Sequence, residues 1–228
     1  MVNYNEPKPS TFDNFWEQRL KDYSKTEEFK AIYNEVLEEL PLPGRKLKTP
    51  VVVSLIGIPG TGKSTFSKLL QEFIPAVHLR SDTIGLFKLP KGPEFDYYKA
   101  YVIKHALARY YLSRGFSVIM DDNNRTKYNR ERVYKMAQSY GAKNILFFLH
   151  LPLEEALKRS QTRDAQEGRI AEFHQKKESL LNFQRQIENP TREELDKWSL
   201  TYIDIDASKS IDGIKIVLRK NQTINLLI

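Results

Sequence analysis

The fold of this chain is decided by one stretch of sequence, Gly57-Ile58-Pro59-Gly60-Thr61-Gly62-Lys63-Ser64-Thr65. It matches the phosphate-loop pattern G-x-x-x-x-G-K-[ST] at every required position. An apolar run, Val51 to Ile56, precedes it, and a helical pattern from Lys63 to Phe73 follows. Because the motif requires a strand before the loop and a helix after it, the stretch predicts a nucleoside triphosphate site.

Each residue type in the stretch suits phosphate binding. Glycines let the backbone turn back, so that successive N–H groups point inward and bind an anion. Lys63 can reach the β- and γ-phosphates, and the Ser64 hydroxyl can bind Mg²⁺. The helix directs its positive end at the same phosphates. The residues predicted to bind the nucleotide are Gly57, Pro59, Gly60, Thr61, Gly62, Lys63, Ser64 and Thr65.

Length and composition limit the remaining possibilities. The 228 residues suit one α/β domain with an appendage. The chain has no cysteine, which excludes disulfides and agrees with a reducing cytoplasm, the expected location. No apolar run approaches the roughly 18 residues of a membrane helix, so no membrane segment is expected. The net charge of +7 fits both a polyanionic partner and a lysine-rich solvated surface.

The first 50 residues precede the nucleotide-binding unit. Apolar residues recur at helical spacing in residues 12–23 and 29–40, and Ser24-Lys25-Thr26-Glu27 forms a capping-box pattern before the second run. Prolines and a glycine in residues 41–44 end the pattern. We expect an N-terminal helical extension, residues 1–45, that packs against the main domain; binding of a partner is the alternative.

The rest of the chain, residues 50–228, alternates strand and helix patterns. This alternation indicates right-handed βαβ crossovers, an α/β fold and a mainly parallel sheet with ligands at the carboxyl ends of the strands. The tail from Ser208 onward fits either a helix or a strand. The predicted strands are Val51–Ile56, Ala76–Leu79, Phe116–Met120, Asn144–His150 and Leu200–Ile205.

Acidic residues follow two of these strands. Asp121 ends the third strand, as expected of an acid that holds Mg²⁺. The metal role is left open between Asp121, which we prefer, and Asp122, and either Asp122 or Asn124 is expected to cap the next helix. Asp82 follows the second strand, where a kinase needs a base that accepts the proton of the attacking hydroxyl; a loop aspartate or helix cap is the alternative.

Three arginines, Arg159, Arg163 and Arg169, lie in a polar segment between two helical patterns. Guanidinium groups on a closing lid can neutralise charge that develops on the γ-phosphate while they exclude water. We expect a lid around residues 159–170, with surface arginines as the alternative. The predicted catalytic residues are Lys63, Asp82, Arg159 and Arg163.

Together these motifs resemble the small P-loop kinases, a group that includes phage polynucleotide kinase, zeta toxins and the kinase that phosphorylates seryl-tRNA(Sec). The resemblance spans about residues 51–206. Residues 1–50 have no counterpart in it, and the tail after Asp206 is short for a tRNA-binding domain. The stretches that carry the resemblance are Gly57–Thr65, Ser81-Asp82, Val118–Asn124, Arg130, Val133-Tyr134, Leu151–Glu154, Arg159, Phe183–Pro190, Trp198 and Leu200–Asp204.

The resemblance implies a P-loop NTPase fold with strand order 2-3-1-4-5, an ATP-Mg²⁺ donor, Asp82 as the base and arginines on a lid. It implies an ATP-dependent kinase that phosphorylates a hydroxyl of a nucleic acid, an aminoacyl-tRNA or a small molecule. The contrasting hypothesis is an ATPase or switch protein that acts on a protein partner and phosphorylates no acceptor.

Overall fold

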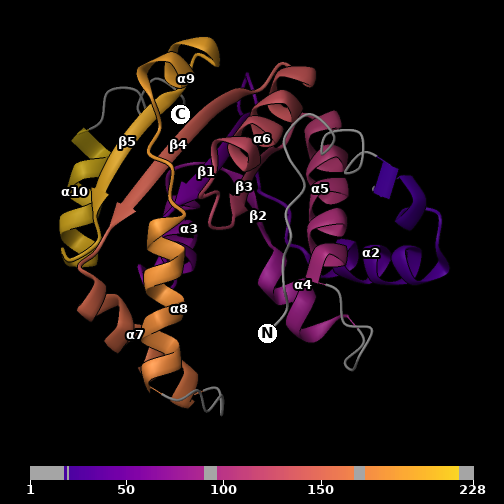
Figure 1. The fold of residues 1–228 in the computed structure, drawn as a ribbon. Helices are drawn as coiled ribbons and strands as arrows, with labels where there is room; N and C mark the ends of the chain where they lie inside the picture. Colours follow the sequence, from indigo (N-terminus) through magenta and orange to yellow (C-terminus); the bar gives the residue numbers. More distant parts are fainter. Residues whose placement is uncertain (1–17, 20, 90–96, 167–172, 221–228) are drawn as a thin grey trace. The chain divides into compact units, whose positions relative to one another are not determined.

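The computed structural model describes residues 18–19, 21–89, 97–166 and 173–220 (Figure 1). The chain forms two compact units. Residues 1–40 and 80–108 make the first, and residues 41–79 and 109–228 make the second. The phosphate loop and nearly all of the sheet therefore belong to the second unit, whereas the N-terminal segment belongs to the first.

The second unit is built on a five-stranded sheet in the order β2-β3-β1-β4-β5 (Figure 1). β1 pairs in parallel with β3 and with β4, and β4 pairs in parallel with β5. The predicted fold class, strand order and mainly parallel pairing are confirmed. The strands are β1 (Val51–Ile56), β2 (Ala76–Arg80), β3 (Ser117–Asp121), β4 (Lys143–His150) and β5 (Thr201–Asp206).

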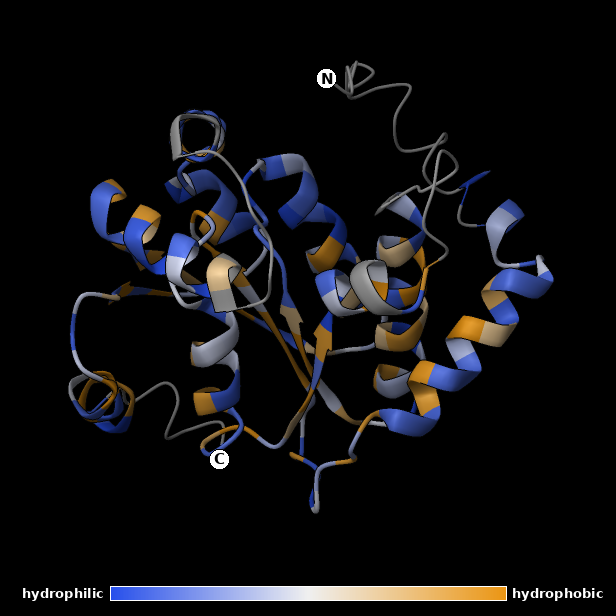
Figure 2. Ribbon diagram, turned by 90° about the horizontal axis from the view of Figure 1, so that it is seen from below, coloured by the Kyte–Doolittle hydropathy of each residue, from blue (hydrophilic) through white to orange (hydrophobic). Residues whose placement is uncertain are grey.

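Helices cover both faces of this sheet, which is why β1 is buried along its whole length. Alternate residues of β1 point to opposite faces. Val51, Val53 and Leu55 share a core with α3 (Lys63–Leu70) and α10 (Ile211–Lys220), and α6 (Lys127–Ser139) contacts β1 and β4. The strands carry mainly apolar colours in Figure 2. The other helices of this unit are α7 (Leu153–Gln166), α8 (Phe173–Arg185) and α9 (Arg192–Lys197).

Two segments differ from the sequence prediction. α7 continues to Gln166, so the described part of the segment predicted as a polar linker is helical. The buried residues of α7, Ala156, Leu157 and Ser160, all lie before its last turns. Because the last turns bury no apolar side chain, the sequence there shows no helical periodicity that would have predicted them. The tail from Ser208, which fitted two structures, contains α10, whose Leu218 is fully buried.

The first unit joins the N-terminal helix α2 (Glu27–Glu39) to α4 (Ser81–Phe87) and to the first part of α5 (Tyr97–Ser113). Lys88 donates hydrogen bonds to Glu35 and Glu39 of α2, at 2.7 and 2.6 Å. The predicted cap of α2 was wrong by two residues. Thr26 accepts from the Phe29 N–H, whereas the Ser24 hydroxyl donates to the Lys21 carbonyl.

A buried ion pair holds the loop that follows β3. The Arg130 guanidinium, on α6, donates to both carboxylate oxygens of Glu194, on α9, at 2.7 and 2.8 Å, and both side chains are 0% exposed. Its Nη1 lies 2.9–3.3 Å from three carbonyl oxygens, those of Asn124, Arg125 and Glu188. Since Asn124 and Arg125 are in the β3–α6 loop, Arg130 fixes that loop to α9 and to the segment after α8.

The same loop is held from two further sides. The Asn124 amide donates to the Leu55 carbonyl of β1 at 3.2 Å. The Glu188 N–H donates to the Arg125 carbonyl at 2.8 Å, and the Glu188 carboxylate accepts from the Lys127 N–H. A loop tied to β1, α6 and α9 gives the carboxyl end of β3 a defined position.

Among the described residues, no helix is both long enough and apolar enough to cross a bilayer.

Removing one member of the buried pair is expected to destabilise the second unit. Glu194→Ala leaves an unpaired guanidinium in the core, which costs about 3–5 kcal/mol in the free energy of unfolding. Arg130→Met combined with Glu194→Leu removes both charges, so the double variant should be more stable than Glu194→Ala. Urea denaturation of the wild type, Glu194→Ala, the two component variants Arg130→Met and Glu194→Leu, and the double variant measures this difference. Additive losses in the double variant would contradict the coupling.

Candidate active site

The phosphate loop has the geometry that its glycines predict. Gly60 and Gly62 have φ values of +91° and +87°, which L side chains rarely adopt. A Cβ on Gly60 would lie 2.2 Å from the Ala156 carbonyl oxygen of α7. The Thr61 N–H and hydroxyl both donate to the Ile58 carbonyl, at 3.2 and 2.9 Å, which closes the turn. The loop is thus pressed against α7 at a point where only glycine fits.

Lys63 begins α3 and its side chain returns across the loop. Its Nζ donates to the carbonyl oxygens of Gly57, at 2.8 Å, and Ile58, at 3.1 Å. An ammonium group has three donors on a flexible stem, so it can exchange carbonyl partners for phosphate oxygens. The predicted position of Lys63 inside the phosphate loop is therefore the observed one.

Asp121 lies beside the phosphate loop at the end of β3. The residue is 7% exposed, and the nearby Ser64 hydroxyl is one of the groups that lower the pKa of its carboxyl. Its Oδ2 lies 2.8 Å from Nε2 of His78, on β2. Burial raises the pKa of Asp121, but the His78 and Ser64 contacts and the Lys63 charge outweigh it, and the pKa falls below its usual range. Asp121 is thus ionised at neutral pH, and His78 Nε2 acts as the donor.

His78 is a residue of this site that the sequence analysis missed. Its imidazole bonds the carboxylate of Asp121 across two strands, so it orients the acid. One signal could have found it: a polar side chain in a strand whose neighbours, Val77 and Leu79, are buried and apolar. Since His78 and Asp121 lie 43 positions apart in the chain, no local spacing indicates their contact.

The oxygen donors at this point fit Mg²⁺. In the part of the chain that the structure describes, no three His, Asp or Glu side chains gather in a way that could hold a metal. The Ser64 hydroxyl nevertheless lies close enough to the Asp121 carboxyl to lower its pKa. Mg²⁺ typically takes one or two protein carboxylates together with substrate phosphates and water. Two adjacent oxygen ligands beside a phosphate loop are a suitable protein contribution to such a site.

The residues after Asp121 have other roles than predicted. Neither Asp122 nor Asn124 caps α6, because Thr126 does so by accepting from the Asn129 N–H at 3.2 Å. Asn124 has a φ of +34° and is 5% exposed, which suits its bond to β1. Asparagine adopts this left-handed conformation more readily than most residues. The cap was misplaced because several Asx and Thr side chains precede the helix.

Asp82 occupies the first turn of α4, two residues after β2 ends. Arg80 donates to both of its carboxylate oxygens, at 3.2 and 2.8 Å, and the Thr83 N–H donates to Oδ1 at 2.8 Å. These bonds fix the carboxylate and leave it partly exposed. Each oxygen keeps acceptor capacity for a hydroxyl. Asp82 belongs to the first unit and the phosphate loop to the second, so its role as base stays a prediction.

The two arginines predicted on the lid are both on α7. Arg159 forms an ion pair with Glu155, and its Nη1 donates to the Ala207 carbonyl, after β5, at 3.1 Å. Arg163 lies one turn further along the helix and is exposed. Arg169 and the end of the predicted lid lie outside the described residues. The arginines thus extend from an ordered helix rather than from a linker between helices.

The comparisons with known proteins agree with this site. Residues 52–190, more than half of the chain, match a family model described as an AAA domain. The chain belongs to the AAA domain family. Within that family it falls in the P-loop kinase group that the sequence resembles, so this prediction is confirmed. The matched residues include Gly57–Thr65, the loop described above.

Relatives of this AAA domain protein include a tRNA kinase. The L-seryl-tRNA(Sec) kinase of Methanococcus maripaludis is 26% identical over 190 residues, which cover 78% of this chain and 69% of the kinase. A chain of the PezAT toxin–antitoxin system of Streptococcus pneumoniae has a TM-score of 0.60 at 17% identity, with coverages of 82% and 80%. A fungal RNA kinase has a TM-score of 0.53 at 15% identity, with coverages of 78% and 89%. These structural likenesses establish a shared fold.

The close contact at Gly60 predicts a sharp difference between two glycines. Gly60→Ala collides with the Ala156 carbonyl and forces an unfavourable φ, so ATP binding should fall by more than tenfold and the melting temperature should drop. Gly44→Ala is the matched control, since a Cβ there meets nothing within 4 Å. Calorimetric titration with a non-hydrolysable ATP analogue and thermal melting test both. Equal affinities for the two variants would contradict the proposed fit of the loop.

The His78–Asp121 contact predicts a pH-dependent loss of nucleotide affinity. In His78→Leu the buried carboxylate loses its donor, so its pKa should rise and Mg²⁺-ATP affinity should fall about tenfold. The deficit should grow as pH falls, because protonation removes the charge that attracts the metal. Titration of a fluorescent ATP analogue at several pH values and Mg²⁺ concentrations measures it. His78→Gln, which keeps an N–H donor, should lose less; identical profiles for both variants would contradict an orienting role.

Proposed function

We propose that this protein is an ATP-dependent kinase that transfers the γ-phosphoryl group to a hydroxyl of an acceptor. The observation that carries the proposal is the phosphate loop, with Lys63 folded back across it, beside the ionised carboxylate of Asp121 at the end of β3. It unites at one point a phosphate-binding loop, a lysine and two oxygen ligands for Mg²⁺. Ser64 and Asp121 are the residues that would hold Mg²⁺, which would supply positive charge to the phosphates of ATP.

Different residues act on the nucleotide side and on the acceptor side of the reacting phosphorus. Lys63 and the loop N–H groups hold the β- and γ-phosphates of ATP. On the acceptor side, Asp82 accepts the proton as the hydroxyl oxygen attacks the γ-phosphorus. The bond from that phosphorus to the β–γ bridging oxygen breaks and ADP leaves. Asp82 then returns the proton to water. Its bonds from Arg80 and Thr83 support this role, since they fix the direction of the carboxylate.

Arg159 and Arg163 are the proposed source of positive charge over the transferred group. They lie four residues apart on α7, and α7 presses on the phosphate loop at Gly60. Guanidinium groups stabilise the charge that develops on the phosphoryl oxygens. Because Arg159 bonds Glu155 and the Ala207 carbonyl, its engagement with phosphate requires an exchange of partners.

The acceptor is proposed to be a nucleic acid, an aminoacyl-tRNA or a smaller hydroxyl compound, with nucleic acid preferred. The net charge of +7 supports an anionic acceptor. The tRNA kinase among the relatives supports RNA in particular. A screen with γ-³²P-ATP over total tRNA, 5′-hydroxyl oligonucleotides and small alcohols identifies the acceptor class.

Two variants test the assignment of roles. Lys63→Ala should lower the transfer rate by orders of magnitude while the protein stays folded. Asp82→Asn keeps the size of the side chain but accepts no proton, so transfer should fall at least a hundredfold while ATP affinity is retained. Label transfer and nucleotide affinity are measured in parallel. If no acceptor becomes labelled and a protein partner stimulates ATP hydrolysis, the protein is an ATPase and the kinase proposal fails.

A further inference from the structure

The edge of the sheet at which the strands begin is strongly basic. Because β1, β3 and β4 are parallel, the segments before them meet at this edge, opposite the phosphate loop. These segments, residues 41–50, 109–117 and 138–144, contain six Lys or Arg and no Asp or Glu. We name them the basic edge. All six cations are exposed: Arg45, Lys46, Lys48, Arg109, Arg114 and Lys143.

Contacts between the three segments place the cations on one continuous surface. The Lys143 N–H donates to the Pro50 carbonyl at 2.9 Å, which joins the starts of β1 and β4. The Val51 N–H donates to the Ser117 hydroxyl at 3.0 Å, which joins β1 to β3. The ammonium of Lys46 lies 4.3 Å from the centre of the Phe116 ring. Positive charge from three separate segments is thereby concentrated at one edge.

Aromatic rings accompany these cations. The Arg114 guanidinium lies 3.6 Å from the centre of the Tyr110 ring and donates to the Tyr110 carbonyl at 3.2 Å. Phe116 and Tyr110 are both half-buried. Rings that alternate with cations are typical of surfaces that bind single strands, where phosphates meet cations and bases stack on planar groups.

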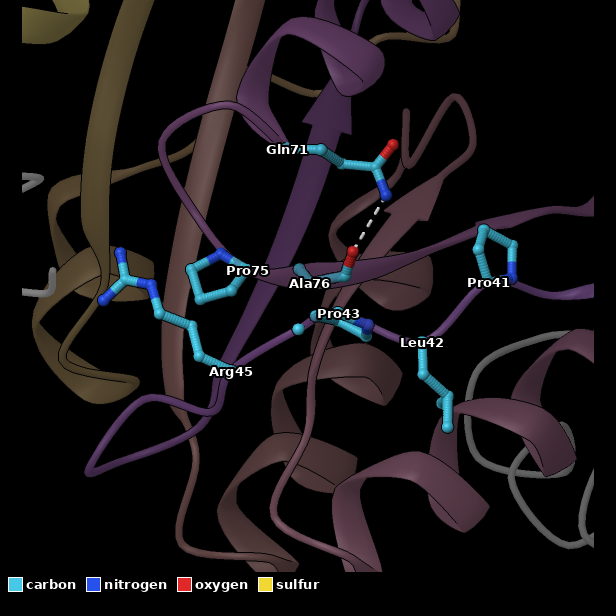
Figure 3. Close-up of a pocket in the computed structure, with 8 residues that line it drawn as sticks. Pro41, Leu42, Pro43, Arg45, Gln71, Pro75 and Ala76 are labelled. Atoms are coloured by element: carbon cyan, nitrogen blue, oxygen red, sulfur yellow. Dashed lines mark hydrogen bonds between the residues drawn. The ribbon is translucent and has the colours of Figure 1, made fainter.

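A hollow opens at the same edge (Figure 3). It has a volume of about 430 Å³, within the range of ligand pockets. The connector before β1 supplies one wall, with Pro41, Leu42, Pro43 and Arg45, and the segment from Gln71 to Ala76 supplies the other. Leu42 is 59% exposed. Figure 3 shows Leu42 and Arg45 at opposite ends of the connector, so an apolar side chain and a cation both border the hollow.

We propose that the basic edge is a docking surface for single-stranded RNA, with backbone phosphates on the exposed cations and a base in the hollow beside Leu42. Charge complementarity favours this partner, since the three segments of the basic edge hold six cations and no acidic residue. Glu72, in the segment that forms the other wall of the hollow, is paired with Lys215. A membrane surface is disfavoured because, among the described residues, Leu42 is the one large hydrophobic side chain exposed at this edge.

The distance across the sheet makes this surface informative about the acceptor. β1 has six residues, so about 20 Å separate the basic edge from the phosphate loop. A small alcohol cannot reach both, whereas a strand of several nucleotides can. RNA binding itself needs no ATP. The inference therefore rests on the proposed kinase function only where it treats the docked RNA as the phosphoryl acceptor.

The test measures the affinity of a fluorescein-labelled 20-nucleotide RNA for the full chain by anisotropy, without ATP, at several salt concentrations. Lys48→Glu combined with Lys143→Glu reverses two exposed charges of the basic edge. Lys25→Glu combined with Lys30→Glu, at exposed positions of the first unit, is the charge-matched control. Thermal melting verifies that both variants are folded.

The basic-edge variant should bind RNA at least tenfold more weakly, with the log–log salt slope reduced by about 1.4 for two lost phosphate contacts. The control should change affinity less than twofold. Leu42→Ser should weaken binding about fivefold or more with an unchanged salt slope, since it removes an apolar contact to a base. Equal losses in both charge variants, or no loss in the basic-edge variant, would overturn the proposal.

Two further outcomes distinguish RNA docking from membrane binding and from phosphoryl transfer. Vesicles of phosphatidylserine and phosphatidylcholine form a parallel arm of the assay. If the basic-edge variant loses vesicle binding but retains RNA binding, the edge is a membrane surface and the proposal is wrong. If RNA binds the edge as expected but neither this RNA nor any acceptor of the γ-³²P-ATP screen becomes labelled, the docking surface stands and the kinase proposal alone fails.

Discussion

The parallel pairing of β1 with β3 is the constraint on which this structure depends. It places the end of β3 beside the loop that follows β1, and so brings the Asp121 carboxylate to the Ser64 hydroxyl. Neither residue could hold Mg²⁺ and phosphate without the other at this distance. The packing of apolar side chains on both faces of β1 maintains the pairing, so the chemistry of the site rests on the hydrophobic core.

Two buried contacts between charged or polar side chains lie near this pairing and have different roles. The Arg130–Glu194 pair is wholly enclosed, and carbonyl oxygens satisfy the remaining guanidinium donors, as a stable buried charge requires. The His78–Asp121 contact instead joins a carboxylate at the end of β3 to the neighbouring strand β2. The first contact positions the loop after β3, and the second keeps an acid ionised beside the phosphate loop.

The second unit presents anion-binding features at both edges of its sheet. At the carboxyl edge, loop N–H groups and Lys63 form a compact site suited to the phosphates of one nucleotide. At the opposite edge, exposed lysines and arginines are spread over three segments, which suits a flexible chain of phosphates. The first unit differs, because its lysines at positions 88 and 99 are paired with glutamates of α2.

The sequence by itself determined the fold class and the nucleotide-binding loop, and the resemblance to the small P-loop kinases implied the strand order. The signals were local: glycines at positions that need positive φ, a lysine and a serine at fixed spacing, and apolar β-branched runs. Local patterns of this kind can be recognised in the sequence before the tertiary structure is known. The placement of Asp121 at a strand end followed from the same logic. The extent of α7 and the caps of α2 and α6 did not, because polar residues satisfy helix, cap and loop patterns equally.

Only the tertiary structure decided which distant residues meet. His78 and Asp121 are 43 positions apart, and Arg130 and Glu194 are 64 apart, so no spacing rule relates them. The same holds for the basic edge, whose three segments come together because parallel strands all begin at one side of the sheet. A periodic pattern records which face of an element is buried, whereas contacts between elements are set by sheet order and packing. That is why the sequence determined the loop that binds phosphate, and the fold determined the residues that surround it.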